Sequence, residues 1–231
     1  MNGPRILCVG MATIDHVFRL PAIPREPTMV DEAGERLVCG YTDPKVYDAE
    51  ATLPLDKLAG FDAVHADCRW WKAARQVLPA ARALGIPTVF DGDIAPGEIL
   101  SEVAPLAQYP IFSEKGLVLA TPGIEHDDRL AHIAQRAGGF AGVTLGARGF
   151  VWHDGTGLHK LGVPDVKVID TLGAGDVFHG AYAYALGFGM DCATAARFAS
   201  ATAALKCTRF GGRSGTPTHA EVDALLERWD A

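Results

Sequence analysis

The chain has 231 residues, with 21 Lys and Arg against 28 Asp and Glu, and a formal net charge of −7. An acidic chain of this kind lacks the basic stripe that binds a phosphate backbone, which argues against nucleic acid as a partner. The longest apolar run near the N-terminus, residues 6–14, is too short to span a bilayer and ends at Asp15. It also lacks the basic flank of a secretory signal, so we expect a cytoplasmic protein without a membrane partner.

The cysteines give no sign of a metal or redox centre. Their number is odd, and no two are separated by only two residues, so neither a zinc cluster nor a dithiol pair is predicted. We expect free thiols in a reducing compartment. Glycine is the overrepresented residue, with 26 copies, and the positions of the glycine clusters indicate where function resides.

Strand and helix patterns alternate along most of the chain. The predicted strands are residues 6–10, 36–41, 63–66, 86–90, 110–112, 140–145 and 150–153, the last followed by a hairpin turn. The predicted helices are residues 71–84, 98–106, 127–137, 176–186, 192–206 and 220–229. This alternation favours an α/β fold with a mostly parallel sheet, in one domain covering residues 1–231.

The strongest local signal is Asp170-Thr-Leu-Gly-Ala-Gly-Asp-Val-Phe-His-Gly-Ala181. Small residues at Gly173, Ala174 and Gly175 precede a predicted helix, whose first N–H groups have no partners within the helix. Such a turn suits a phosphate group, because nothing bulky keeps the anion from the amides. No Gly-Lys-Ser/Thr follows, so this is not a P-loop.

Asp176 lies beside this turn, where a carboxylate would repel a bound phosphate unless it takes part in chemistry. A general base that removes a proton from an attacking hydroxyl would explain its position. The alternative is that Asp176 caps the helix and the glycines only form a tight turn. His179, farther along the same helix, is expected to be packed or capping.

The twelve residues from Asp170 to Ala181 resemble the C-terminal signature of the PfkB, or ribokinase-like, family of sugar kinases. The resemblance covers nearly the whole chain and implies a three-layer α/β/α sandwich with a small β lid. It also implies that Asp176 is the catalytic base and that the amides of Gly173, Ala174 and Gly175 form the anion hole. ATP, Mg²⁺ and a monovalent cation such as K⁺ are the cofactors that it implies.

The resemblance extends to the nucleotide and cation positions. Val143-Thr-Leu-Gly-Ala-Arg-Gly149 is similar to a turn that holds the nucleotide, which assigns Thr144, Gly146 and Gly149 to it, although a plain hairpin turn is the alternative. Residues 197–212 resemble the segment that wraps the adenine and the cation, which adds Ser200 and Gly211 to the nucleotide site. The implied cation ligands are the Asp170 side chain and the carbonyls of Leu172, Lys206, Arg209 and Gly211. Gly215 stands where the family often has a serine ligand.

The magnesium motif departs from the family pattern. An Asn-x-x-Glu is usual where this chain has Phe112-Ser-Glu-Lys-Gly116, so Glu114 is the substitute that we expect to act through water. Asp91 and Asp93 resemble the family's Asp-x-Asn at the end of a strand, where open sheets bind ligands. Asp93 is therefore a candidate for the phosphate and Mg²⁺ site, with a loop-capping role as the alternative.

On the sugar side, Gly10 and Asp15 match the family's first strand and the aspartate that accepts from sugar hydroxyls. A turn residue is the alternative for Asp15. Arg69 could bind an anionic substituent, and residues 34–43 and 66–70 look similar to the sulfofructose-kinase branch. A surface arginine over an aromatic ring is the alternative for Arg69.

The chain is short for this family, because the span that carries the lid strands and a sugar-binding Gly-Gly-Asn is missing near residues 28–31. Three explanations are open: disordered residues left out with the numbering closed over the gap, a true deletion, or a degenerate relative. The first is favoured, because the flanks resemble ordinary family sequence. The function predicted is ATP-dependent phosphorylation of a sugar, with a homodimer as the expected assembly. The alternative is a non-catalytic nucleotide- or sugar-binding relative.

Overall fold

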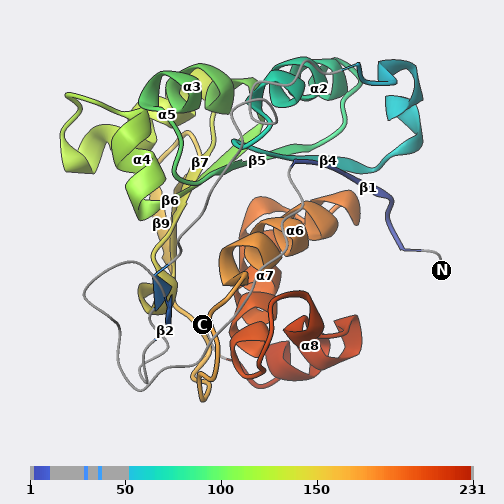
Figure 1. The fold of residues 1–231 in the computed structure, drawn as a ribbon, viewed down its shortest axis with the longest axis vertical. Coiled ribbons are helices and arrows are strands. Elements are labelled where there is room, and N and C mark those ends of the chain that lie inside the picture. Colours follow the sequence, from blue (N-terminus) through green and yellow to red (C-terminus); the bar gives the residue numbers. More distant parts are fainter. Residues whose placement is uncertain (1–2, 11–28, 31–35, 38–51, 230–231) are drawn as a thin grey trace.

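A computed structural model describes residues 3–10, 29–30, 36–37 and 52–229 of the chain. Within these residues one sheet has the strand order β1-β4-β5-β6-β7-β8-β9 (Figure 1). Its strands are β1 (Ile6–Val9), β4 (Ala63–Asp67), β5 (Thr88–Gly92), β6 (Tyr109–Ser113), β7 (Ala141–Thr144), β8 (Phe150–His153) and β9 (Leu158–Leu161). The strands from β1 to β7 pair in parallel, and β8 and β9 are antiparallel. The parallel strands therefore all end at the same edge of the sheet.

Helices cover both faces of the sheet (Figure 1). The α-helices are α2 (Trp71–Ala83), α3 (Gly97–Val103), α4 (Glu114–Ala120), α5 (Arg129–Ala137), α6 (Ala174–Gly187), α7 (Cys192–Cys207) and α8 (His219–Leu226). The 3-10 helices are η1 (Leu55–Gly60), η2 (Ala104–Leu106), η3 (His126–Asp128), η4 (Gly146–Arg148) and η5 (Arg213–Gly215). The first four α-helices lie on one face, and α6, α7 and α8 lie on the other.

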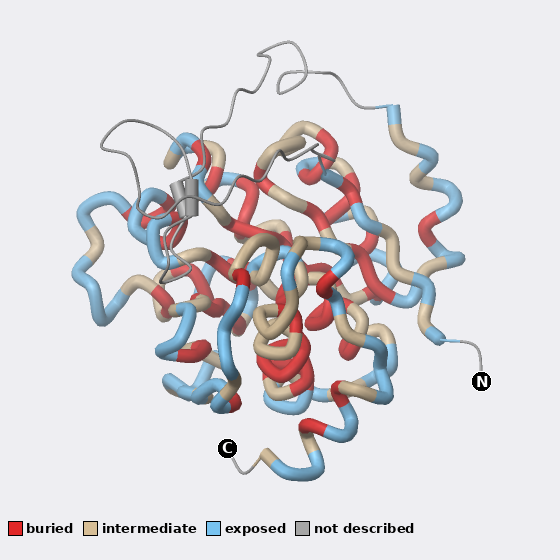
Figure 2. Tube along the Cα trace, turned by 60° about the horizontal axis from the view of Figure 1, so that its bottom comes forward, coloured by how far each residue is buried: buried red, intermediate tan, exposed pale blue. Residues whose placement is uncertain are grey.

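Two hydrophobic cores fill the space between these layers. Because side chains alternate along a strand, Phe90 and Phe112 pack in the core under α2 to α5, whereas Val89 and Ile111 pack in the core under α6 to α8. Figure 2 shows the buried residues gathered along the sheet and the helix faces turned toward it. The predicted three-layer α/β/α sandwich is confirmed.

The structure adds elements that the sequence patterns did not predict. They include η1, η4, η5, β9, the short helix α4 after β6, and the strand β2 (Met29–Val30), which pairs antiparallel with β3 (Arg36–Leu37) in a second sheet. The strand predicted for residues 36–41 is described only at Arg36–Leu37. The junction predicted near residues 28–31 lies outside the described residues except for Met29–Val30.

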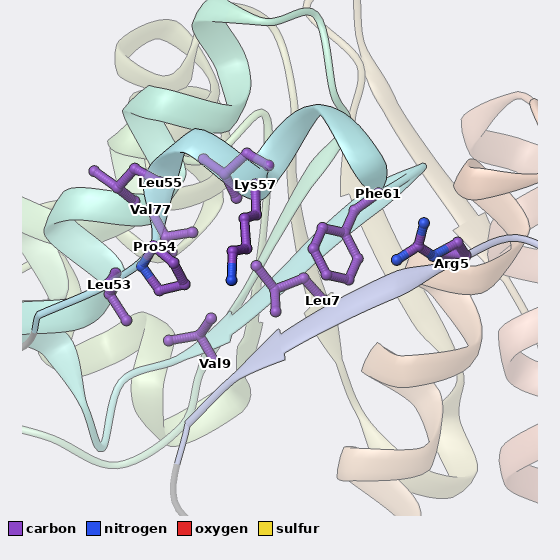
Figure 3. Close-up of a pocket in the computed structure, with 10 residues that line it drawn as sticks. Arg5, Leu7, Val9, Leu53, Pro54, Leu55, Lys57, Phe61 and Val77 are labelled. Atoms are coloured by element: carbon purple, nitrogen blue, oxygen red, sulfur yellow. The ribbon is translucent and has the colours of Figure 1, made fainter.

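A pocket of about 200 Å³ lies between β1 and η1, at the edge of the main sheet (Figure 3). Apolar side chains such as Leu7, Val9 and Phe61 line the pocket, and the basic side chains of Arg5 and Lys57 line it as well. None of its lining residues belongs to the predicted site.

Over the described residues, no helix is both long and apolar enough to cross a membrane.

Candidate active site

Carboxylates gather where β4 and β5 end and α6 begins. Asp67 is the last residue of β4, and Asp91 and Asp93 lie at the end of β5. The pKa of Asp91 is raised to about 6, mainly by burial; His179 acts to lower it, and the charges of Asp176, Asp93 and Asp67 act to raise it. The predicted base on α6 and the predicted Asp93 therefore share one electrostatic environment at the carboxyl edge of the sheet, where open α/β sheets bind ligands.

The turn before α6 has the backbone geometry of an anion site. Gly173 caps the helix with φ of 71°, a left-handed conformation that glycine adopts without strain. The first helical hydrogen bond runs from Val177 N–H to Gly173 O at 2.9 Å, and Ala174 N–H donates to Thr171 O at 3.1 Å. The amides of Gly175 and Asp176 thus precede the first helical bond, at the positive end of the helix dipole.

Gly175 has no packing reason to be glycine. Among the described residues, a Cβ there would meet no atom within 4 Å apart from its own helix backbone and chain neighbours, and its backbone has no positive φ. Gly175 and Asp176 are both exposed, so the amides and the carboxylate face open space together. The arrangement leaves room for a group that approaches the backbone closely, as the sequence analysis predicts for a phosphate.

His179 lies beneath this turn and is buried. Its Nδ1 is 2.8 Å from Gly175 O and 3.4 Å from an oxygen of Asp91, and its Nε2 is 3.2 Å from Ile111 O. The histidine therefore joins the first turn of α6 to β5 and β6. Its predicted packed position agrees with the structure.

The second glycine turn, after β7, is explained in part by the protein itself. Thr144 Oγ1 donates to Phe112 O at 3.3 Å, and Gly146 and Gly149 have φ of 57° and 94°. A Cβ at Gly149 would overlap the carbonyl oxygen of Leu161 in the neighbouring strand. Gly146 is open: no atom from elsewhere in the described part of the chain lies within 4 Å of its Cβ position. Gly149 therefore has a structural role whether or not a nucleotide binds.

Asp170 organises the loop that follows α7. It is buried, and its two carboxylate oxygens accept from Leu172 N–H and Gly211 N–H, both at 2.8 Å. Its backbone carbonyl accepts from the ammonium of Lys206 at 2.8 Å. Asp170 thus ties the 172–173 turn to the 211–215 loop.

Two of the carbonyls predicted to hold a monovalent cation, those of Lys206 and Arg209, lie close to the same position. A Cβ at Gly215 would lie 3.4 Å from Lys206 O and 3.3 Å from Arg209 O, and Leu172 O is 3.8 Å from the Cβ position of Gly212. The charge balance differs from the expectation, because the ammonium of Lys206 is fully buried and lies 3.9 Å from a carboxylate oxygen of Asp170. The residues present therefore do not fit an added cation: the carboxylate already has a positive partner.

The predicted magnesium residues are ion-paired. Arg69 contacts Asp93 at 3.2 Å, and Arg148 contacts Glu114 at 2.5 Å. Among the described residues, no group of three acidic, His or Cys side chains could hold a metal ion. Single carboxylates fit a magnesium ion that arrives with nucleotide phosphates, because such ions take only one or two protein carboxylates.

The sugar side is described only in part. A Cβ at Gly10 would overlap the carboxylate of Asp67, a neighbour of the candidate site that the sequence did not single out. Asp67 Oδ1 accepts from Arg69 N–H and Trp70 N–H, so it fixes the turn that carries Arg69. An aspartate directly after the 63–66 strand was the available signal. Asp15 lies outside the described residues, and Ser200 is buried within α7.

Comparison with known proteins places the fold. A crystallised protein from Agrobacterium tumefaciens, provisionally named a ribokinase, is 30% identical with a TM-score of 0.90, and the match covers 99% of both chains. A fructokinase double mutant from Vibrio cholerae O395, bound to fructose, ADP and potassium ion, is 25% identical with a TM-score of 0.64, covering 75% of this chain and 64% of that one. The ribokinase of Lactococcus lactis subsp. lactis is 40% identical over 85 residues, which are 37% of this chain and 28% of that protein.

The matches also bear on the length of the chain. It spans well under two thirds of the Lactococcus ribokinase but matches the Agrobacterium chain nearly end to end. The model of the pfkB family carbohydrate kinases matches residues 28–219, which are most of the sequence. By this match and by its fold, the chain belongs to the pfkB family of carbohydrate kinases.

Proposed function

We propose that this protein transfers the γ-phosphoryl group of ATP to a hydroxyl of a sugar. The observation that carries the proposal is the start of α6, where the open position of Gly175 and the exposed carboxylate of Asp176 lie side by side. If the turn only bound phosphate, the neighbouring carboxylate of Asp176 would weaken binding, because two negative charges repel each other. The arrangement becomes favourable when the carboxylate removes a proton from the group that attacks the phosphate.

The chain's own groups divide the reaction between them. Asp176 accepts the proton of the sugar hydroxyl as its oxygen attacks phosphorus, and the bond to the ADP oxygen breaks. The amides at Gly173, Ala174 and Gly175 were predicted to hold the transferred group. Since Ala174 N–H already donates to Thr171 O, we assign the larger part of this role to Gly175 N–H and Asp176 N–H.

The nucleotide side is assigned to the turn after β7 and to the segment after α7. Thr144, Gly146 and Gly149 would face the phosphates, and Ser200 and Gly211 would belong to the nucleotide site. Magnesium, when bound with ATP, neutralises phosphate charge. Asp93 and Glu114 are the carboxylates that would hold it, directly or through water.

The sugar is assigned only as a class. Gly10 and Asp15 would contact its hydroxyls, and Arg69 would contact an anionic substituent if the substrate has one. Arg69 forms an ion pair with Asp93, which we assign to the phosphate and Mg²⁺ site. This pair supports a position of the Arg69 guanidinium near the end of the sugar that is phosphorylated. A sulfo-sugar, as in the sulfofructose-kinase branch, remains the specific prediction for this arginine.

A coupled assay of ADP release tests the proposal. Purified protein is incubated with ATP, Mg²⁺ and a panel of hexoses, pentoses, nucleosides and sulfo-sugars. We expect ADP release that depends on one class of sugar and that Asp176→Asn abolishes. If no sugar in the panel causes ADP release, and the protein has the verified mass and still binds ATP, the proposal is contradicted. That result would favour a non-catalytic binding protein.

A further inference from the structure

The last turn of α7 carries a lysine in an unusual position. Lys206 has no exposed surface, and its ammonium donates to Asp170 O at 2.8 Å. The same ammonium is 3.9 Å from Oδ2 of Asp170, whose side chain is also buried. A buried ammonium is costly unless an acidic group and hydrogen bonds compensate it, so this pair is a built feature of the loop.

The pair lies at the point that sets the geometry of the α6 turn. Asp170 holds Leu172 N–H with one oxygen and Gly211 N–H with the other. The Cα of Gly212 lies 3.6 Å from the Cβ position of Gly173, so the loop packs directly against the helix cap. The positive group that neutralises Asp170 therefore also stabilises the backbone of the turn before α6, which we assign to the phosphate.

Two features of the loop argue against an added monovalent cation in this role. Asp170 supplies one negative charge, and Lys206 already balances it. Oδ2 of Asp170 lies 3.9 Å from the buried ammonium of Lys206, so a cation coordinated by this oxygen would be close to a second positive charge. Like charges repel strongly where water is excluded. The loop also has glycine at position 215, so the position where the family often has a serine ligand offers no side-chain oxygen to a cation.

We propose that the ammonium of Lys206 is a built-in replacement for a monovalent cation. Lys206 is then a positioning residue: it holds Asp170, the 211–215 loop and the α6 turn in place, and catalysis needs no added K⁺. The activity part of this inference rests on the proposed kinase function. The structural part, that Lys206 neutralises Asp170, does not.

The wild-type protein gives the first test. Sugar-dependent ADP release and the thermal unfolding midpoint are measured in KCl and in choline chloride at the same ionic strength. We expect rates within about twofold of each other and equal midpoints, because matched ionic strength leaves only specific ion effects. Activation by K⁺ of about tenfold or more, or a midpoint raised by K⁺ over choline, would overturn the proposal.

Removal of the ammonium gives the second test. In Lys206→Ala, Asp170 loses its partner and the loop gains space, so we expect ADP release to fall about tenfold in choline chloride and to recover in KCl. The unfolding midpoint should then rise with K⁺ as it does not in the wild type. Lys160→Ala, on an exposed part of β9, is the matched control and should behave as wild type.

These arms separate the possible failures. Lys206→Met keeps the apolar stem and replaces the alanine variant if that variant does not fold. A folded Lys206 variant that is as active and as stable in choline as the wild type would overturn the proposal. If no sugar supports ADP release, the kinase function fails, and the midpoints in KCl and choline still decide whether Lys206 replaces a cation.

Discussion

The two glycine-rich turns of this protein have similar sequences but different physical constraints. In the turn after β7, Gly149 is required by the fold, because a side chain there would overlap Leu161 O. In the turn before α6, Gly175 has open space around its Cβ position and ordinary backbone angles. Gly149 is needed with or without a ligand, whereas neither packing nor backbone angles account for Gly175, which we propose serves a ligand.

This difference shows how a glycine motif can be divided into structural and functional parts. Gly173 is fixed by its φ of 71° as the helix cap, whereas our proposal assigns Gly175 to a ligand that approaches the backbone. Exchange of each glycine should therefore affect different quantities. Stability should respond at Gly149, and activity should respond at Gly175.

The largest effect is expected at the carboxylate beside the open turn. Asp176→Asn keeps the shape of the side chain but cannot accept the proton, so kcat should fall by about 10³-fold or more. ATP binding should survive and tighten, because Asp176 is exposed and the neutral amide no longer repels the phosphates. Steady-state kinetics with a titration of ATP binding measures both, and near wild-type turnover would remove Asp176 from the role of base.

The structural turn should respond to a single methyl group. Gly149→Ala forces a positive φ on alanine and drives its Cβ into Leu161 O, so we expect a loss of about 2–4 kcal/mol in unfolding free energy. Gly146→Ala is the control, since it shares the positive φ but has open space. Urea unfolding of both variants measures the difference. Equal losses would show that backbone strain, rather than the overlap, accounts for Gly149.

The open turn should lose activity without losing stability. Gly175→Val places a side chain in the space assigned to phosphate, so we expect kcat to fall about 100-fold while urea unfolding changes by less than about 1 kcal/mol. The comparison between turns is sharpened if Gly149→Ala shows the reverse. A Gly175→Val variant with normal turnover would mean that the phosphate lies elsewhere.

Sequence patterns predicted the sheet and most helices because strands 63–66, 86–90 and 140–145 are short, mostly apolar segments followed by turn residues. They did not predict α4, because it has only seven residues and contains Gly116. That glycine is required where a Cβ would overlap Gly92 O, a contact between distant segments. Ser113, which accepts from Gly116 N–H as the helix cap, was the only local signal.

The site was predictable where neighbouring residues make it and unpredictable where the fold brings residues together. The 173–176 turn follows from local sequence. The pairing of Lys206 with Asp170 does not, because the two are 36 positions apart and only the packing of α7 turns the ammonium inward. The pairs Arg69–Asp93 and Arg148–Glu114 were missed for the same reason.

The smallest predicted effect concerns pH and the two groups behind the turn. Burial, with the charge of His179, lowers the pKa of His65 from 6.5 to about 3, and burial raises the pKa of Asp91 from 3.8 to about 6. His65 binds a proton more readily when unfolded, so its contribution to stability is present above pH 6.5 and is lost as the pH falls toward 3. Asp91 has the opposite sign: folding is favoured as the pH falls from 6 to 3.8.

These opposed slopes can be separated by substitution. Between about pH 7 and 5, the unfolding free energy of His65→Leu should fall by about 2 kcal/mol less than that of the wild type. Asp91→Asn should lose more than the wild type over the same interval. Urea unfolding at the two pH values measures both, and identical pH dependence in all three proteins would mean that neither group is perturbed by burial.

The central claim is that the turn before α6, and Gly175 in particular, receives the phosphate. Backbone amide NMR spectra before and after addition of a non-hydrolysable ATP analogue, Mg²⁺ and the sugar identified by the ADP assay test this directly. We predict that the amide signals of Gly175 and Asp176 shift strongly while that of the control residue Gly155, in the turn between β8 and β9, does not. Saturated binding that leaves the Gly175 and Asp176 signals unmoved would contradict the account.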